Sequence, residues 1–181
     1  MAAVSPSVYR PPRWTLVWLA LSSLICTWDA LYILCRPHSM KGGSLFWIWS
    51  PYHLYSVTDY MYGLPALRDN NGFVAAQSVL NLFENALNIT ALVLFAKQDP
   101  AGLLVGFTSS AITASKTVLY YLNDQQAGWA HTGHNSRWNW WTLFFFPSSF
   151  WLLFPSLLVI VYGRQIARTL RAAATGKEKV K

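Results

Sequence analysis

The sequence predicts an all-α integral membrane protein, a bundle of four transmembrane helices with an aromatic interfacial cap between the first and second helices. Of its 181 residues, 54% are hydrophobic, 16% are aromatic and only 12% are charged. The charged residues gather at the two ends and in short connections, which leaves four long windows with at most one charge each. Ten Trp and nine Tyr, many at the edges of these windows, are typical of the aromatic belts at membrane surfaces.

The first apolar window extends from Trp14 to Cys35 and contains a single charge, Asp29. It meets the requirement of roughly 20 residues for a spanning helix. The segment before it lacks the pattern of a cleaved signal peptide, so we expect an anchor that stays in the protein. Cys26 and Cys35 are too far apart along one helix axis to form a disulfide.

The connection that follows, residues 36–71, is too interrupted by Gly and Pro to span a membrane. It is also too aromatic for a mobile loop. Its segment SLFWIWSPYHLYSVTDYMYG predicts short interfacial helices or a re-entrant cap over the mouth of the bundle. Asp59 lies in this segment, where it either reaches a cavity or caps a short helix.

Three more windows predict spans over residues 73–96, 101–122 and 140–162. Residues 97–100, Lys-Gln-Asp-Pro, predict a tight turn between the second and third spans. The expected organisation is therefore a cytosolic N-terminus at residues 1–13, a four-span domain at 14–162 and a basic cytosolic tail at 163–181.

The basic residues predict the orientation of the chain. An even number of spans puts both termini on one side, and six of the fourteen basic residues lie between Arg164 and Lys181, which makes that side cytosolic. Lys177 and Lys179 resemble a dibasic retrieval signal and predict the endoplasmic reticulum membrane, with an ordinary solvated tail as the alternative. The tail also explains much of the net charge of +7, so we expect no nucleic-acid partner.

A polar stripe runs along the second span. Its members recur at spacings of three and four: Gln77, Asn81, Glu84, Asn85 and Asn88. A carboxylate near the bilayer midplane costs about 3 kcal/mol even on lenient scales, and each buried amide needs hydrogen-bond partners. The stripe is therefore expected to face the bundle interior or a cavity.

The charged residues of the spans predict a cluster. A helix rise of about 1.5 Å per residue places Glu84 near the midplane, and Asp29 and Lys116 at one depth, roughly 7 Å towards the lumen. We expect these three side chains to meet and to neutralise one another inside the membrane. The cluster could be a functional site or a salt bridge that only fixes the register of the helices. The spans contain more carboxylates and amides than one ion pair needs, which favours a functional site.

Other polar side chains could contact a ligand. Tyr120 lies on the third span, and Ser148 and Trp151 lie on the fourth. The Trp151 ring could face a cation or simply pack against other side chains. His131 and His134 have no neighbouring Cys or carboxylate to complete a metal site, so we expect no metal there. We expect these histidines to cap the cavity or to bond to the aromatic connection.

Four segments taken together resemble the superfamily of the emopamil-binding protein and the sigma-2 receptor, whose shared unit is the EXPERA domain. The segments are TWDALY (27–32), YSVTDYMY (55–62), LFENA (82–86) and TVLYYLND with GWAHTGHN (117–135), and residues 144–160 are similar to the family's last helix. The resemblance implies a four-helix bundle with a cavity open to the membrane. It also implies family acids at Asp29, Asp59 and Glu84, and binding of a sterol or a cationic amphiphile.

In the isomerase branch of that superfamily, a double bond moves when one carbon is protonated and its neighbour loses a proton. The resemblance thus implies Asp29 and Glu84 as catalytic acid and base, without a cofactor. Together with the polar positions above, the expected ligand contacts are Asp59, Asn81, Asn88, Lys116, Tyr120, Ser148 and Trp151. Ile25, Lys116 and Ser148 stand where the isomerases carry a histidine, an acid and an asparagine, which leaves a related isomerisation or cyclisation of another terpenoid open.

Three classes of function are open. The first is a cofactor-free isomerase of a sterol-like or terpenoid substrate, with proton transfer between Asp29 and Glu84. The second is a non-catalytic sterol or cationic-amphiphile binding protein of sigma-2 receptor type, and the third is a structural membrane subunit. The expected partners are the small apolar molecule and membrane lipid, and the sequence leaves a homodimer open.

Overall fold

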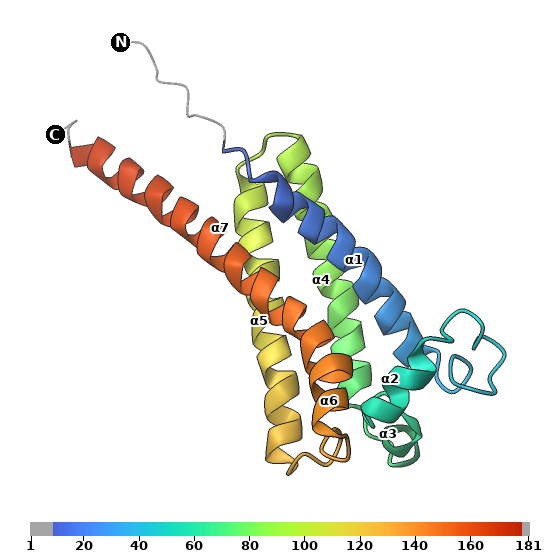
Figure 1. The fold of residues 1–181 in the computed structure, drawn as a ribbon. Coiled ribbons are helices and arrows are strands. Elements are labelled where there is room, and N and C mark those ends of the chain that lie inside the picture. Colours follow the sequence, from blue (N-terminus) through green and yellow to red (C-terminus); the bar gives the residue numbers. More distant parts are fainter. Residues whose placement is uncertain (1–8, 179–181) are drawn as a thin grey trace.

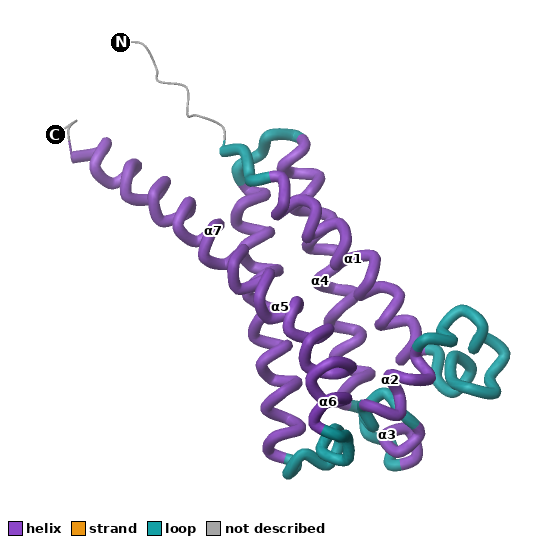
Figure 2. Tube along the Cα trace, in the orientation of Figure 1, coloured by secondary structure: helices purple, strands orange, loops and turns teal. Residues whose placement is uncertain are grey.

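The computed structural model describes residues 9–178 and the side chains of residues 9–175. Its elements, in order, are α1 (Arg13–Leu34), α2 (Tyr52–Thr58), α3 (Leu64–Arg68), α4 (Phe73–Ala96), α5 (Ala101–Gln126), α6 (Arg137–Asn139), the π-helical segment η1 (Trp140–Phe145) and α7 (Phe146–Glu178) (Figure 1). The described part of the chain contains helices and loops and no strand (Figure 2), so the all-α prediction is confirmed. Lys179 of the expected retrieval signal, and residues 1–8, lie outside the described residues.

Three helical segments of the described chain are long and apolar enough to cross a membrane. They are α1, α4 and the continuous segment Arg137–Thr175. Their outward faces expose large apolar side chains, such as Leu24 at 71% and Phe83 at 55%. Soluble monomers rarely expose apolar surface along whole helices, whereas a bilayer removes it from water. The chain is therefore a membrane protein.

The long helices pack in sequence, α1 against α4, α4 against α5 and α5 against α7 (Figure 1). Small residues bring α5 and α7 close together. A Cβ on Gly106 would lie 3.0 Å from the Tyr162 ring, and one on Gly163 would lie 3.1 Å from the Phe107 ring. Close approach at small residues is the usual way in which helices associate in membranes.

The connection between α1 and α4 is packed rather than loose. The side chains of Trp49 and Met61 are buried in one apolar cluster with Tyr32 and Ile33 at the end of α1. The Trp49 indole N–H also donates a hydrogen bond of 2.9 Å to the carbonyl of Trp28. These contacts hold α2 and α3 at the end of the molecule opposite to the start of α1 and the end of α7 (Figure 1).

The last helix departs from a regular α-helix at its start and extends beyond the predicted span. The π-helical segment η1 precedes Pro147, which has no N–H and whose ring displaces the carbonyl four residues earlier. The helix then continues past Tyr162, the predicted end of the fourth span, to Glu178. Residues 163–175 contain four Ala and three Arg and lack proline, so nothing in their sequence ends the helix.

Candidate ligand cavity

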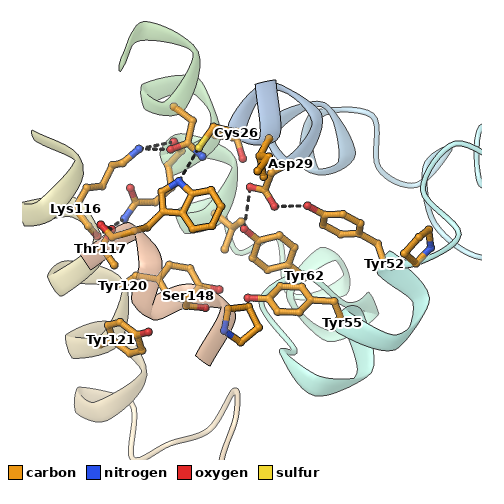
Figure 3. Close-up of a pocket in the computed structure, with 18 residues that line it drawn as sticks. Cys26, Asp29, Tyr52, Tyr55, Tyr62, Lys116, Thr117, Tyr120, Tyr121 and Ser148 are labelled. Atoms are coloured by element: carbon orange, nitrogen blue, oxygen red, sulfur yellow. Dashed lines mark hydrogen bonds between the residues drawn. The ribbon is translucent and has the colours of Figure 1, made fainter. Parts of the chain in front are cut away.

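A cavity of about 400 Å³ lies between α1, α4, α5 and α7, and side chains from the connection close one side of it (Figure 3). Pockets for small molecules commonly measure about 300–1,000 Å³. Six of the nine side chains that the sequence predicts for the site line this cavity: Asp29, Asn81, Lys116, Tyr120, Ser148 and Trp151. The other three, Asp59, Glu84 and Asn88, do not line it.

Asp29 is held by two tyrosines of the connection. Its Oδ1 accepts a hydrogen bond of 2.6 Å from the Tyr52 hydroxyl, and its Oδ2 accepts one of 3.0 Å from the Tyr62 hydroxyl (Figure 3). Burial, followed by the nearby Asp29 charge, raises the pKa of both phenols above its ordinary value, so both stay protonated and donate. The carboxyl group of Asp29 thus faces the cavity with a fixed orientation.

Lys116 and Glu84 form a buried ion pair. The Lys116 Nζ lies 2.7 Å from Glu84 Oε1, and the two side chains are 10% and 4% exposed. The same ammonium group donates to Asn81 Oδ1 and to the Gln77 carbonyl, and Glu84 Oε2 accepts a hydrogen bond of 2.8 Å from Thr113. The predicted meeting of Glu84 with Lys116 is therefore confirmed.

The predicted pairing of Asp29 with Lys116 is wrong. Within the described residues, the ion pair of Lys116 joins it to Glu84, and both Asp29 oxygens are occupied by tyrosines. The depth estimate placed Asp29 and Lys116 at one height but carried no information on rotation about each helix. In the fold, α4 packs against both α1 and α5, so Lys116 on α5 meets α4 rather than α1.

Glu84 lies behind Lys116 rather than in the cavity. Its carboxylate borders a separate space of about 10 Å³, together with Asn85, Asn88 and Thr113. Lys116 lines the main cavity and binds Glu84, so it connects this carboxylate to the cavity wall. The structure therefore does not bring the two predicted catalytic carboxylates to one surface.

Asn88 cross-links helices instead of facing the cavity. Its Nδ2 donates to Ser23 Oγ on α1 at 3.2 Å, and its Oδ1 accepts from Ser109 Oγ on α5 at 2.7 Å. The polar stripe extends over twelve residues, from Gln77 to Asn88, or roughly 16 Å along the helix axis. Only the beginning of the stripe, Gln77 and Asn81, lines the main cavity, and Asn88 lies outside it.

Asp59 reaches the cavity only through Tyr120. The side chain is fully buried directly after α2, where its Oδ1 accepts the Met61 backbone N–H at 2.9 Å. Its Oδ2 accepts a hydrogen bond of 2.5 Å from the hydroxyl of Tyr120, which itself lines the cavity. Asp59 therefore lies outside the lining of the cavity, and its connection to the cavity is the hydroxyl group of Tyr120.

The protonation of Asp59 makes stability depend on pH. Burial raises its pKa to about 7 from an ordinary value of 3.8, and the hydrogen bonds from Tyr120 and Met61 lower it too little to offset this. Between these two pKa values the folded protein holds a proton on Asp59 that the unfolded chain releases. The stabilisation that the protonated Asp59 provides is therefore complete below about pH 4 and is lost as the pH rises to about 7.

We therefore expect the unfolding temperature of the wild type to fall, relative to that of Asp59→Asn, between pH 5 and pH 8. Thermal unfolding of the purified protein in detergent measures this difference. Asp69→Asn, an exposed aspartate of the same connection, is the matched control and should follow the wild type. If the unfolding temperatures of the wild type and Asp59→Asn changed with pH in parallel, the raised pKa of Asp59 would be contradicted.

Trp151 is held by its indole N–H, which donates to the Cys26 sulfur at 2.9 Å. Its ring also packs edge-on against Trp18, with the ring centroids 5.8 Å apart. Both Trp151 and Cys26 line the cavity. Cys26 and Cys35 are free thiols, as predicted.

The two histidines contact the connection. His134 Nε2 lies 2.8 Å from the Val57 carbonyl, and its ring stacks on Tyr60 at 3.8 Å. The His131 carbonyl accepts the Tyr60 backbone N–H at 3.1 Å. Of the two predicted roles, bonding to the aromatic connection is therefore the one that the structure supports.

Sequence reasoning missed the tyrosines that bind Asp29. A signal was present, because an acid in a spanning helix needs donors and the connection is rich in tyrosine. Which of these tyrosines reaches Asp29 depends on the path of an irregular segment. Hydrophobic periodicity does not describe such a path, so Tyr52 and Tyr62 could not be singled out.

The fold and the cavity together define a helical membrane protein with an internal chamber that presents one carboxyl group, one ammonium group and several phenols. No protein-family model matches the chain. A curated protein, the 3-beta-hydroxysteroid-Delta(8),Delta(7)-isomerase of Cavia porcellus, is 25% identical over 104 residues, which cover 55% of this chain and 45% of the relative. The chain thus spans less than half of the curated relative that it matches. This similarity supports, in part, the resemblance to the emopamil-binding protein superfamily.

Proposed function

We propose that the chain is an EXPERA-type membrane protein that isomerises a sterol-like or terpenoid substrate. The observation that carries the proposal is the cavity of about 400 Å³ inside the helices, with Asp29 on its wall. Its size suits a small molecule, and its position inside a membrane protein suits an apolar one. The partial match to a sterol isomerase points to the same class of substrate.

The proposed reaction moves one double bond. A proton adds to one alkene carbon, and the neighbouring carbon of the resulting cation loses a proton to a base, so that no net proton or electron is consumed. Asp29 is the carboxyl group that faces the cavity and is assigned as the direct acid or base. Glu84 acts through Lys116, which binds it and lines the cavity, and the Trp151 ring shelters the cation.

The proposed placement is a four-span bundle in the endoplasmic reticulum membrane, with both termini in the cytosol and the aromatic connection as a cap at the lumenal surface. Residues 14–162 would form the membrane domain, with α5 as the fourth crossing helix. The start of α1 and the end of α7 lie at one end of the molecule (Figure 1), as an even number of crossings requires. Arg164, Arg168 and Arg171 lie at that same end, which suits the positive-inside rule.

The second candidate is a non-catalytic protein that binds a sterol or a cationic amphiphile. It is favoured by the finding that only one of the two expected catalytic carboxylates, Asp29, lines the cavity. A single carboxylate with two tyrosine donors suffices to hold a ligand amine or hydroxyl group. This candidate needs no second proton-transfer group.

Incubation in heavy water separates the two candidates without a guess about the substrate. Membranes that contain the protein are incubated in heavy water, and the recovered lipids are analysed by mass spectrometry against membranes without the protein. An isomerase introduces carbon-bound deuterium into one sterol or terpenoid species, because the added proton comes from exchangeable groups. Saturable retention of a sterol with no incorporation in any lipid would instead establish the binding protein.

A further inference from the structure

Two adjacent side chains on the cavity wall carry polar atoms without partners. Gln77 and Ser78 belong to the cavity-facing part of α4 and are only 8% and 1% exposed. Within the described part of the chain, neither Gln77 Oε1 nor Ser78 Oγ has a hydrogen-bond partner. Buried polar atoms in native proteins are almost always paired, so these two atoms indicate a partner that the protein itself does not supply.

The orientation of Gln77 is set by a reciprocal contact with Lys116. The Gln77 Nε2 donates to the Lys116 carbonyl at 3.5 Å, and the Lys116 Nζ donates to the Gln77 carbonyl at 3.4 Å. This contact uses the donor end of the Gln77 amide and leaves its acceptor end, Oε1, free. At these two consecutive residues the wall therefore offers one acceptor, Gln77 Oε1, and one hydroxyl group that can donate, Ser78.

Lys116 itself has no spare proton for a ligand. Its three ammonium protons are directed at Glu84, Asn81 and the Gln77 carbonyl. Its ammonium group lies 3.4 Å from the Gln77 carbonyl oxygen and is paired with Glu84, so the Glu84 charge is not free to bind a cationic ligand group there. A carboxylate or a ketone is also a poor partner, because neither can donate to Gln77 Oε1.

We propose that Gln77 and Ser78 anchor the hydroxyl group of the ligand, so that the ligand is a neutral and largely apolar alcohol. A hydroxyl group donates to Gln77 Oε1 and accepts from the Ser78 hydroxyl, which satisfies both atoms. This inference rests on the proposed function and adds to it the two residues of the cavity wall that bind the ligand's hydroxyl group. The anchor lies on α4, and Asp29 on α1 is left for the remainder of the ligand.

The test compares probes that differ only in one functional group. The full-length protein in detergent micelles is loaded with tritiated cholesterol, which is displaced by unlabelled cholesterol, by its 3-ketone or by the hydrocarbon that lacks the oxygen. The same three functional groups are compared on a linear terpenoid skeleton. We expect the alcohol to bind about tenfold more tightly than the ketone and the hydrocarbon on whichever skeleton binds, since two hydrogen bonds are at stake.

Ser78→Ala and Gln77→Leu should each lower the affinity for the alcohol towards that of the hydrocarbon, while binding of the hydrocarbon stays the same. Ser78→Ala removes an unpaired atom, so the ligand-free variant should unfold at the same temperature as the wild type or higher. Ser110→Ala is the matched control, because Ser110 is buried on α5 with its hydroxyl bonded to the Gly106 carbonyl. It should retain the preference for the alcohol.

The outcomes separate this inference from the proposed function. The hydroxyl anchor is overturned if the protein binds sterols without preferring the alcohol. It is also overturned if that preference persists in Ser78→Ala and Gln77→Leu. Either result still supports a sterol ligand. A preference seen only on the linear skeleton supports the anchor and overturns the sterol. Binding of no probe to the wild-type protein overturns both.

Discussion

Replacing Lys116 with methionine is expected to lower the free energy of unfolding by about 3–5 kcal/mol. The variant removes the ammonium group that lies 2.7 Å from Glu84 and leaves a carboxylate that is 4% exposed without its counter-charge. Thr113 would still donate to the other Glu84 oxygen, but one neutral donor does not replace the lost charge. The loss should appear as a large fall in unfolding temperature, measured in detergent or nanodiscs.

A second substitution identifies the cause of that loss. The double variant Lys116→Met with Glu84→Gln removes both charges, and it should recover most of the lost stability because a buried pair can often be replaced by neutral groups at little cost. Lys97→Met, an exposed lysine in the turn after α4, is the matched control and should be neutral. Near wild-type stability of Lys116→Met, or no recovery in the double variant, would contradict the buried pair.

Asp29→Asn is expected to reduce deuterium incorporation from heavy water by about 10²–10⁴-fold. Asparagine keeps the size of the side chain and one acceptor for the Tyr52 or Tyr62 hydroxyl, so the change removes chiefly the ability to exchange a proton. The ligand should still bind within a few-fold, because its apolar body contacts the same walls. Lipid mass spectrometry and tritiated cholesterol binding on the same preparations measure both quantities.

The pattern of the two readouts decides between the candidate functions. Lost incorporation with retained binding supports proton transfer by Asp29. Lost binding of a cationic amphiphile, in a protein that never incorporates deuterium, supports the non-catalytic binding protein instead. Asp99→Asn, an exposed aspartate of the turn before α5, should change neither quantity. Full incorporation in Asp29→Asn would remove this residue from the mechanism.

The sequence predicted the helices well because each depends on a local pattern. Apolar windows of about 20 residues, ended by proline and charges, predicted the positions of α1, α4, α5 and the long last helix within a few residues at most ends. The end of α7 was missed because it follows no such pattern, and helix-forming residues continue beyond Tyr162. The π-helical segment before Pro147 was missed as well, since proline alone does not specify how a helix adapts.

The candidate site could be predicted only in part. The pairing of Glu84 with Lys116 follows from charge and depth, because α4 and α5 are joined by a tight turn and must pack side by side. Asp29 shares that depth, yet α4 lies between its helix and that of Lys116. The partners of Asp29 come from an irregular segment whose path only the tertiary structure gives. The unpaired atoms of Gln77 and Ser78 are likewise visible only once every neighbour is placed.

The central claim is that a small apolar molecule occupies the chamber between the helices, and photolabelling tests it most directly. A sterol carrying a diazirine is bound to the protein and irradiated, and its adducts are located by peptide mass spectrometry. We predict adducts on the cavity-lining Val74 and Trp151, suppressed by excess unlabelled sterol. Adducts confined to the outward-facing Phe83 and Leu153 of the same helices, unaffected by competitor, would contradict the account.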